Sequence, residues 1–254
     1  MNTKLSRGLA VNTTISHDIA EALQDEILRR QYRCGERFPS ERDLAGRFSA
    51  SRGAVREALS QLEQLGLIRV HPGGARVQAV DSASIAVLGP LMAMNELPDP
   101  VLVDQFLQTF GALASLTARS AIDKANADEL VRLEEIIEEL SAHAKDFETM
   151  QPKWREFLEF LALIADNLVV RLISNDLKAQ FVEQMINLGI KPNLEQKAIN
   201  QLLDSLKLSL ARKDGALAGE AIQSHFDQLR LAISKAINIK LASFHKKDST
   251  GVNA

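Results

Sequence analysis

Hydrophobic residues recur at helical spacing from Ile15 onward, after a polar stretch at residues 1–14. Ile19, Leu23 and Ile27 share one stripe, which predicts a first helix from about Ile15 to Gln31. The preceding residues have no such stripe and no apolar core of a signal peptide, so we expect them to be a flexible arm.

A second, short helix is predicted directly after Pro39. Ser40 is placed to cap it by accepting a hydrogen bond from the backbone N–H of Asp43, whose carboxylate suits the positive end of the helix dipole. The inward face of this helix carries Leu44, Ala45 and Phe48. A break at residues 49–50 ends it.

A third helix is predicted to begin after Ser51, which is a plausible N-cap, and to end at Gly66. Its apolar residues recur at helical spacing: Val55, Ala58, Leu59, Leu62 and Leu65. Arg52 and Arg56, four residues apart, therefore stand together on the opposite face. Such an arginine pair suits the major groove of DNA, where a guanidinium group can bind guanine or clamp a phosphate.

Two short β-prone runs follow, at residues 67–70 and 75–80, around the turn His71-Pro72-Gly73-Gly74. This arrangement predicts a β-hairpin. Its tip offers His71 and Arg76 to a DNA backbone or minor groove. Residues 15–80 are thus expected to form a winged helix-turn-helix.

From Ile85 to about His245 the pattern is helical throughout, with breaks at Pro98-Asp99-Pro100 and Lys191-Pro192-Asn193. We expect segments at about 85–95, 99–122, 127–147, 151–164, 167–188, 193–212 and 214–245, the last either continuous or broken. The fold class is mainly α. Residues 81–245 form an antiparallel bundle of six or seven helices, and residues 246–254 a disordered tail.

Charge separates the two parts of the chain. Residues 1–80 hold 12 Lys/Arg against 9 Asp/Glu, a net charge of +3, whereas the remaining 18 against 24 give −6. The basic part suits contact with nucleic acid and the acidic part does not. Cys34 is the one cysteine, and no apolar stretch is long enough to span a membrane, so we expect a cytoplasmic protein.

The motifs together resemble the winged helix-turn-helix of GntR-type bacterial transcription regulators. The matching residues are Phe38-Pro39-Ser40-Glu41-Arg42, then Ser51-Arg52 with Val55-Arg56-Glu57-Ala58-Leu59, then Leu62 with Gly66-Leu67-Ile68. The resemblance implies that Arg42, Arg52 and Arg56 contact DNA, with Ser51, Gly53 and Ala54 at the helix start and His71 at the wing. Relatives often have Thr where this chain has Gly53 and Ala54, which leaves the operator sequence open.

The arrangement of a DNA-binding domain followed by a helical bundle is similar to that of the FadR branch of the family. Two landmarks carry this weaker part of the resemblance, namely Ala165-Asp166-Asn167-Leu168-Val169 and Lys213-Asp214 followed by His225. It implies a homodimer that binds a pseudo-palindromic DNA operator and senses a small-molecule metabolite with the bundle, as repressors of this type do.

Many members of that branch hold a divalent metal through an Asp and a His four residues apart, with two later histidines. On the resemblance, the Asp/His pair falls on Trp154 and Leu158, one later histidine falls near Leu203, and only His225 remains. We therefore expect neither a metal nor a cofactor.

The effector site is correspondingly expected to be apolar and to suit a fatty acyl-type or organic-acid ligand. Its candidate residues are Trp154, Phe157, Leu158, Phe181 and His225. Two alternatives remain open. In one, the aromatic residues belong to an ordinary core in which His225 bonds to a neighbour, and in the other, the bundle only dimerises.

No motif of an enzyme is present, since the sequence has no phosphate-binding P-loop, no GxSxG and no HExxH. The acidic run at Glu134-Glu135 and Glu138-Glu139 is typical of a solvated helix face. The sequence therefore predicts a DNA-binding transcription regulator and not an enzyme. The rival hypotheses are an enzyme with a fortuitous helix-turn-helix and a helical adaptor that binds protein.

Overall fold

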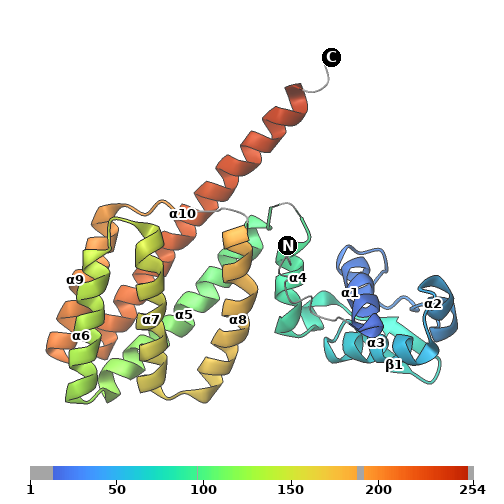
Figure 1. Cartoon of the computed structure of the whole chain (residues 1–254), viewed down its shortest axis with the longest axis horizontal. Coiled ribbons are helices and arrows are strands. Elements are labelled where there is room, and N and C mark those ends of the chain that lie inside the picture. Colours follow the sequence, from blue (N-terminus) through green and yellow to red (C-terminus); the bar gives the residue numbers. More distant parts are fainter. Residues whose placement is uncertain (1–13, 96, 188–191, 251–254) are drawn as a thin grey trace, which may run out of the picture. The chain divides into compact units, whose positions relative to one another are not determined.

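The computed structural model (Figure 1) describes residues 14–95, 97–187 and 192–250, with side chains for all of these except 147, 148, 178–187 and 241–250. The chain divides into two compact units, Met1–Met94 and Asn95–Ala254. The sequence placed the boundary at residue 80 instead. Residues after it stay with the first unit because Val87 is buried in that unit's core and Leu91 and Met94 pack against it.

The N-terminal unit contains three helices and a hairpin: α1 (Ile15–Leu28), α2 (Glu41–Arg47), α3 (Arg52–Gln64), β1 (Ile68–His71) and β2 (Gly74–Val77). Its core is a single cluster that includes Leu23, Leu44 and Leu62, all fully buried. This confirms the winged helix-turn-helix. Helix α1 ends at Leu28 and not at Gln31, because Arg30 takes a left-handed conformation at φ 58°.

The predicted caps are present. The Ser40 hydroxyl accepts from the backbone N–H of Asp43 at 3.2 Å, and the Ser51 hydroxyl accepts from that of Ala54 at 3.2 Å. Gly66 has φ 75° and lets the backbone N–H of Leu67 donate to the Leu62 carbonyl at 3.0 Å. These local interactions fix where α2 and α3 begin and where α3 stops.

The hairpin is antiparallel, with Ile68 opposite Val77, Arg69 opposite Arg76, Val70 opposite Ala75 and His71 opposite Gly74. Its loop is therefore only Pro72-Gly73, and its second strand ends at Val77, before the predicted residue 80. Ile68, Ala75 and Val77 are buried, so this face packs on the core. Arg37, before α2, forms a further antiparallel bridge to Arg76.

Three short helical segments close the first unit: the 3-10 turns η1 (Val80–Ser82) and η2 (Ile85–Val87), and α4 (Leu88–Ala93). The sequence predicted one helix over 85–95. The segment instead begins as a 3-10 turn because the Ser84 hydroxyl accepts from the backbone N–H of Ala86, two residues on.

All the secondary-structure elements described in the C-terminal unit are helices. They are α5 (Pro100–Lys124), α6 (Ala127–Ala142), α7 (Phe147–Ala165), α8 (Leu168–Asn187), α9 (Gln196–Arg212) and α10 (Gly215–Thr250). This confirms the predicted bundle. Helix α10 packs mainly along α5 and α9, α6 lies against α7 and α9, and α5 also contacts α7 and α8. Helix α10 continues past the bundle (Figure 1), so residues 246–250, expected to be a disordered tail, are helical.

Close approach of α5 and α10 depends on glycine. A Cβ on Gly215 would lie 2.3 Å from the Arg119 carbonyl oxygen and 2.4 Å from Asp123 Oδ1. Asp123 also accepts from the backbone N–H of Gly215 at 3.2 Å. The first turn of α10 is therefore seated directly on the backbone of α5.

Candidate nucleic-acid interface

Helix α3 presents its arginines as the sequence predicted. Val55, Ala58, Leu59 and Leu62 are buried in the core of the first unit. Arg52 and Arg56 lie on the other side and are exposed. Arg42, the second residue of α2, is also exposed, so all three predicted arginines are available to solvent.

The residues at the start of α3, beside these arginines, have small side chains. Gly53 is exposed and Ala54 is half-buried, while the Ser51 hydroxyl is used in capping the helix. The backbone of this first turn can therefore approach a ligand closely. The three residues shape the surface, and Arg52 and Arg56 supply its charge.

Arg56 is not free of partners. Its Nη2 lies 3.1 Å from Glu41 Oε2 and its Nε donates to Oε1 at 3.3 Å, joining α3 to the first residue of α2. The hydrogen bond from Arg56 lowers the pKa of Glu41, and the charges of Arg56 and Arg52 act in the same direction. The side chain of Arg56 is 73% exposed, so water and salt screen the pair and another anion can replace Glu41.

A second arginine–glutamate pair has a different environment. Arg47 Nη1 donates to Glu26 Oε2 at 2.9 Å, and its guanidinium carbon lies 4.9 Å from the ring centre of Phe48. Tyr32 donates to the same Glu26 oxygen at 3.1 Å. Glu26 is only 14% exposed, and the hydrogen bond from Arg47 lowers its pKa. This group ties α2 to α1.

The hairpin places the predicted His71 and Arg76 in exposed positions. Arg76 Nη1 donates to the Gly35 carbonyl at 2.9 Å, which anchors its side chain beside the turn before α2. Sequence reasoning missed Arg37 and Arg69, which flank Arg76 on either side. Their grouping depends on strand register, a signal that the sequence provides only once the hairpin pairing is known.

In the second unit, three of the five predicted effector residues come together. Trp154 and Phe157 on α7 have ring centres 5.6 Å apart, and the ring centre of Trp154 lies 4.8 Å from that of His225 on α10. All three are buried, Leu158 is half-buried, and the side chain of Phe181 lies outside the described residues. Burial lowers the pKa of His225 to about 4, so its imidazole is neutral at physiological pH.

A hollow of this unit lies elsewhere. A cavity of about 120 Å³ lies between α5, α7 and α8 and is lined by Thr117, Glu159, Asn167 and Arg171, among others. It is small and has both polar and apolar lining residues, whereas the group around Trp154 is aromatic and closely packed. The geometry therefore separates the predicted effector residues from this hollow.

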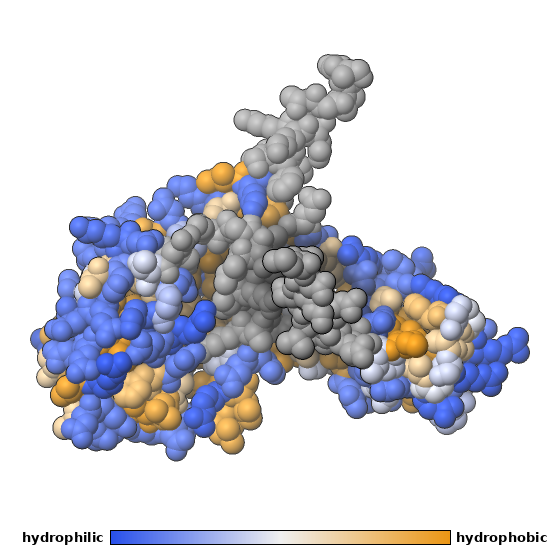
Figure 2. Space-filling view, in the orientation of Figure 1, coloured by the Kyte–Doolittle hydropathy of each residue, from blue (hydrophilic) through white to orange (hydrophobic). Residues whose placement is uncertain are grey.

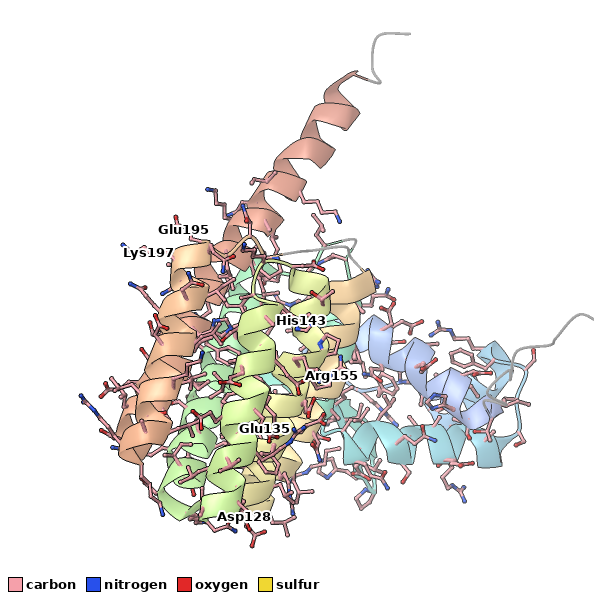
Figure 3. All side chains as sticks on the ribbon, turned by 60° about the vertical axis from the view of Figure 1, so that its left-hand side comes forward. Asp128, Glu135, His143, Arg155, Glu195 and Lys197 are labelled. Atoms are coloured by element: carbon pink, nitrogen blue, oxygen red, sulfur yellow. The ribbon has the colours of Figure 1, made fainter. Side chains whose placement is uncertain are left out.

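Other charged groups of the bundle are spread over its outside. Figure 3 shows Asp128, Glu135 and His143 along α6, Arg155 on α7, and Glu195 with Lys197 at the beginning of α9. These side chains do not converge on a common point. Among the described residues, no group of three or more His, Cys, Asp or Glu is arranged to hold a metal ion.

The visible face of the C-terminal unit is largely hydrophilic, with hydrophobic residues gathered at its lower end (Figure 2). Leu168, Val169 and Leu172 at the beginning of α8 are each more than half exposed, as is Leu163 near the end of α7. In the part of the chain that the structure describes, no helix has the length and apolar character needed to cross a bilayer.

Comparisons with known proteins agree with these two units. Residues 15–77 match the family described as bacterial regulatory proteins, gntR family, and residues 105–228 match the FCD domain. Both matches fall within the units that the structure separates. Together they cover the α1 to β2 segment and most of the helical bundle.

Curated relatives include the HTH-type transcriptional repressor NanR of Cronobacter sakazakii (strain ATCC BAA-894), which is 34% identical over 130 residues, 51% of this chain and 50% of that protein. NanR of Edwardsiella tarda (strain FL6-60) is 31% identical over 135 residues, 52% of each chain. The match thus spans about half the length of these relatives.

A solved structure described as Lar, which controls the expression of the Listeria monocytogenes agr system, has the same fold. It superposes with a TM-score of 0.51 over 89% of this chain and 99% of that chain, at 19% identity. The curated relatives are transcriptional repressors, and residues 15–77 match a family of regulatory proteins. The chain belongs to the GntR family of bacterial regulatory proteins, with an FCD domain as its helical unit.

Proposed function

We propose that this chain is a sequence-specific, homodimeric transcription regulator that binds a pseudo-palindromic operator. The observation that carries the proposal is the exposed pair Arg52 and Arg56 on the first two turns of α3, on the side opposite the helix's buried residues. Helix α3 enters the major groove of one half-site, and Arg42 and His71 contact its flanks. A second copy reads the other half-site.

Glu41 supports the same assignment. A guanidinium group held by one exposed carboxylate is already oriented toward solvent and can exchange that carboxylate for a phosphate or a guanine edge. Arg47, in contrast, is held by a largely buried Glu26 and keeps a structural role.

The exposed apolar residues at the start of α8 support dimerisation. Leu168, Val169 and Leu172 form a contiguous surface on one helix, and a surface of this kind commonly marks contact with another protein. A second copy of this chain is the partner that the two half-sites require.

We further propose that the FCD domain binds a small, largely apolar metabolite beside Trp154 and His225, and that this ligand controls repression. The neutral state of His225 supports an uncharged or weakly polar contact over a carboxylate clamp. The close packing of Trp154, Phe157 and His225 also favours a second candidate, a bundle that dimerises without sensing.

The test is selection of binding sequences from a random duplex library by the full chain, followed by fluorescence anisotropy on the selected operator. Arg56→Ala should weaken operator binding about ten- to hundredfold. Arg155→Ala, which removes an exposed arginine of the bundle, should leave affinity unchanged. Failure to enrich any sequence, or equal affinity of Arg56→Ala, contradicts the proposed function.

Native mass spectrometry of the freshly purified chain separates the two candidates for the bundle. A dimer that carries a co-purified small molecule supports sensing, and loss of that molecule in Trp154→Ala assigns the site. A dimer that carries no ligand and binds its operator with unchanged affinity in Trp154→Ala supports a bundle that only dimerises.

A further inference from the structure

The face of the hairpin that points away from the core carries three arginines in a row. Arg69 is directly opposite Arg76 in the register of β1 and β2, and Arg37 forms an antiparallel bridge to Arg76 from its other side. Residues paired in this way project on the same face, with Cβ atoms about 5 Å apart. All three arginines are exposed.

Gly74 makes room for this row. Its φ is 109°, and a Cβ on it would lie only 3.3 Å from Arg37 Nε, so the guanidinium group of Arg37 lies against bare backbone. Gly74 is paired with His71, two residues along the strand from Arg69, and these share the outer face. The row therefore continues toward the tip of the hairpin.

The carboxylates nearest in sequence do not neutralise the row. Glu36 accepts from the backbone N–H of Arg33 at 2.8 Å, and Glu63 accepts from that of Val70 at 2.7 Å. In the described part of the chain, no ion pair joins Arg37, Arg69 or Arg76 to an acidic residue. Like charges directly opposite each other weaken a hairpin, so the row opposes stability unless an anion binds to it.

We propose that Arg37, Arg76 and Arg69 form a phosphate-binding strip for the DNA backbone beside the base pairs read by α3. The inference rests on the proposed function and extends its contact area from the helix and hairpin tip to the outer hairpin face. Guanidinium groups bind phosphate oxygens in a planar, bidentate manner, and exposed arginines without carboxylates are available for this. Such contacts carry no sequence information, so the strip contributes affinity and not specificity.

The experiment measures binding of the full chain to two duplexes, the selected operator and a mixed-sequence duplex of equal length, across a KCl series. Arg69→Gln and Arg37→Gln are the variants, and Arg76 is left intact because it donates to the Gly35 carbonyl. Each lost phosphate contact should reduce the slope of log affinity against log salt by about 0.9 per chain. Both duplexes should lose affinity by the same factor, leaving their ratio unchanged.

Arg155→Gln is the matched control, since it removes the same charge from an exposed arginine of the bundle and should leave both slopes unchanged. The melting temperature of Arg69→Gln and Arg37→Gln should stay equal to that of the parent chain or rise, because like-charge repulsion is relieved. Unchanged salt slopes, or a loss confined to the operator, overturn the strip.

The two proposals fail in distinguishable ways. If Arg56→Ala loses the operator while the hairpin variants keep the parent salt slopes, the strip is wrong and the proposed function stands. If the parent chain binds neither duplex, both proposals are wrong.

Discussion

In the C-terminal unit, two arginines that stand between helices are each held by two carboxylates. Arg132 contacts Glu135 and Glu156 at 2.8 and 2.7 Å, and Arg230 contacts Asp104 and Asp227 at 2.8 and 3.2 Å. The N-terminal unit differs. Among its described residues, no ion pair involves Arg42, Arg52 or the three arginines of the strip, Arg37, Arg69 and Arg76. Arg56 has one exposed partner, Glu41.

The difference teaches how to separate arginines that hold a fold from arginines that bind a ligand. In the bundle, each of these arginines has one partner on its own helix and one on a neighbouring helix, Glu156 for Arg132 and Asp104 for Arg230, so the cation is satisfied internally. In the winged unit, Arg47 is placed in this way, between α2 and α1, and its partner Glu26 is largely buried, whereas the partner of Arg56 is exposed. Unpaired guanidinium groups on one surface, more than the count of basic residues, mark the region that awaits an anion.

The largest effect is expected from a substitution that disturbs the packing of the bundle. We expect Gly215→Ala to lower the free energy of unfolding by about 3 kcal/mol, because the added Cβ meets the Arg119 carbonyl oxygen. Gly46→Ala in α2 is the matched control: a Cβ there has nothing within 4 Å, so stability should hold or rise. Urea denaturation of both variants measures this, and equal effects would contradict the expected contrast.

Histidine offers a second contrast between the units, since His225 is buried in the bundle and His71 is exposed on the hairpin. Burial lowers the pKa of His225 to about 4, below the value near 6.5 of an unfolded chain. The unfolded state then binds more protons between these values, so stability is present above pH 6.5 and falls as pH drops toward 4.

The loss should approach about 3 kcal/mol for this one group. Chemical denaturation at pH 7, 6 and 5 measures it, with His225→Gln as the variant that lacks the dependence and His71→Gln as the control that keeps it. A parent chain whose stability is flat between pH 7 and 5 would show that His225 is not the neutral, buried group described above.

Arg52 should matter for DNA and not for folding. It is exposed at the first position of α3, and we expect Arg52→Ala to weaken operator binding about ten- to hundredfold. Its melting temperature should match that of the parent chain, because the side chain is not part of the core. A variant that unfolds at lower temperature would place Arg52 among the structural arginines instead.

Arg230 should matter for folding and not for DNA binding, and its substitution should have the smallest effect of those considered. Its two nitrogens contact Asp104 on α5 at 2.9 and 2.8 Å, and the side chain is 24% exposed. We expect Arg230→Ala to cost about 1 kcal/mol of stability, given solvent screening, and to leave operator affinity intact. Thermal denaturation and anisotropy on the same preparation would decide between this result and a role in binding.

Local signals in the sequence predicted the beginnings and ends of elements well. Ser40, Ser51 and Gly66 act within a few residues, and the structure places each where the pattern did. The ends of α1 and β2 were less predictable, because they depend on the left-handed Arg30 and on strand pairing.

Interactions between residues distant in the chain could not be read from the sequence. Glu41 and Arg56 belong to different helices, and Arg37 joins Arg69 only through the bridge to Arg76. The sequence offered Trp154 as a candidate effector or core residue, but its contact with His225 depends on how α7 and α10 pack. Such sites require the fold before they can be recognised, and the roles proposed for these residues stay predictions.

The ion pair between Glu41 and Arg56 has a consequence for the way in which Arg56 binds DNA. When Arg56 meets DNA it exchanges one anion for another, so the net electrostatic gain is smaller than that of a guanidinium taken from water. The carboxylate thus sets a threshold: only a contact better placed than its own hydrogen bonds of 3.1 and 3.3 Å displaces it. On the proposed function, Arg56 can remain with Glu41 on an unrelated duplex, so we expect it to contribute more to discrimination between sequences than to general affinity.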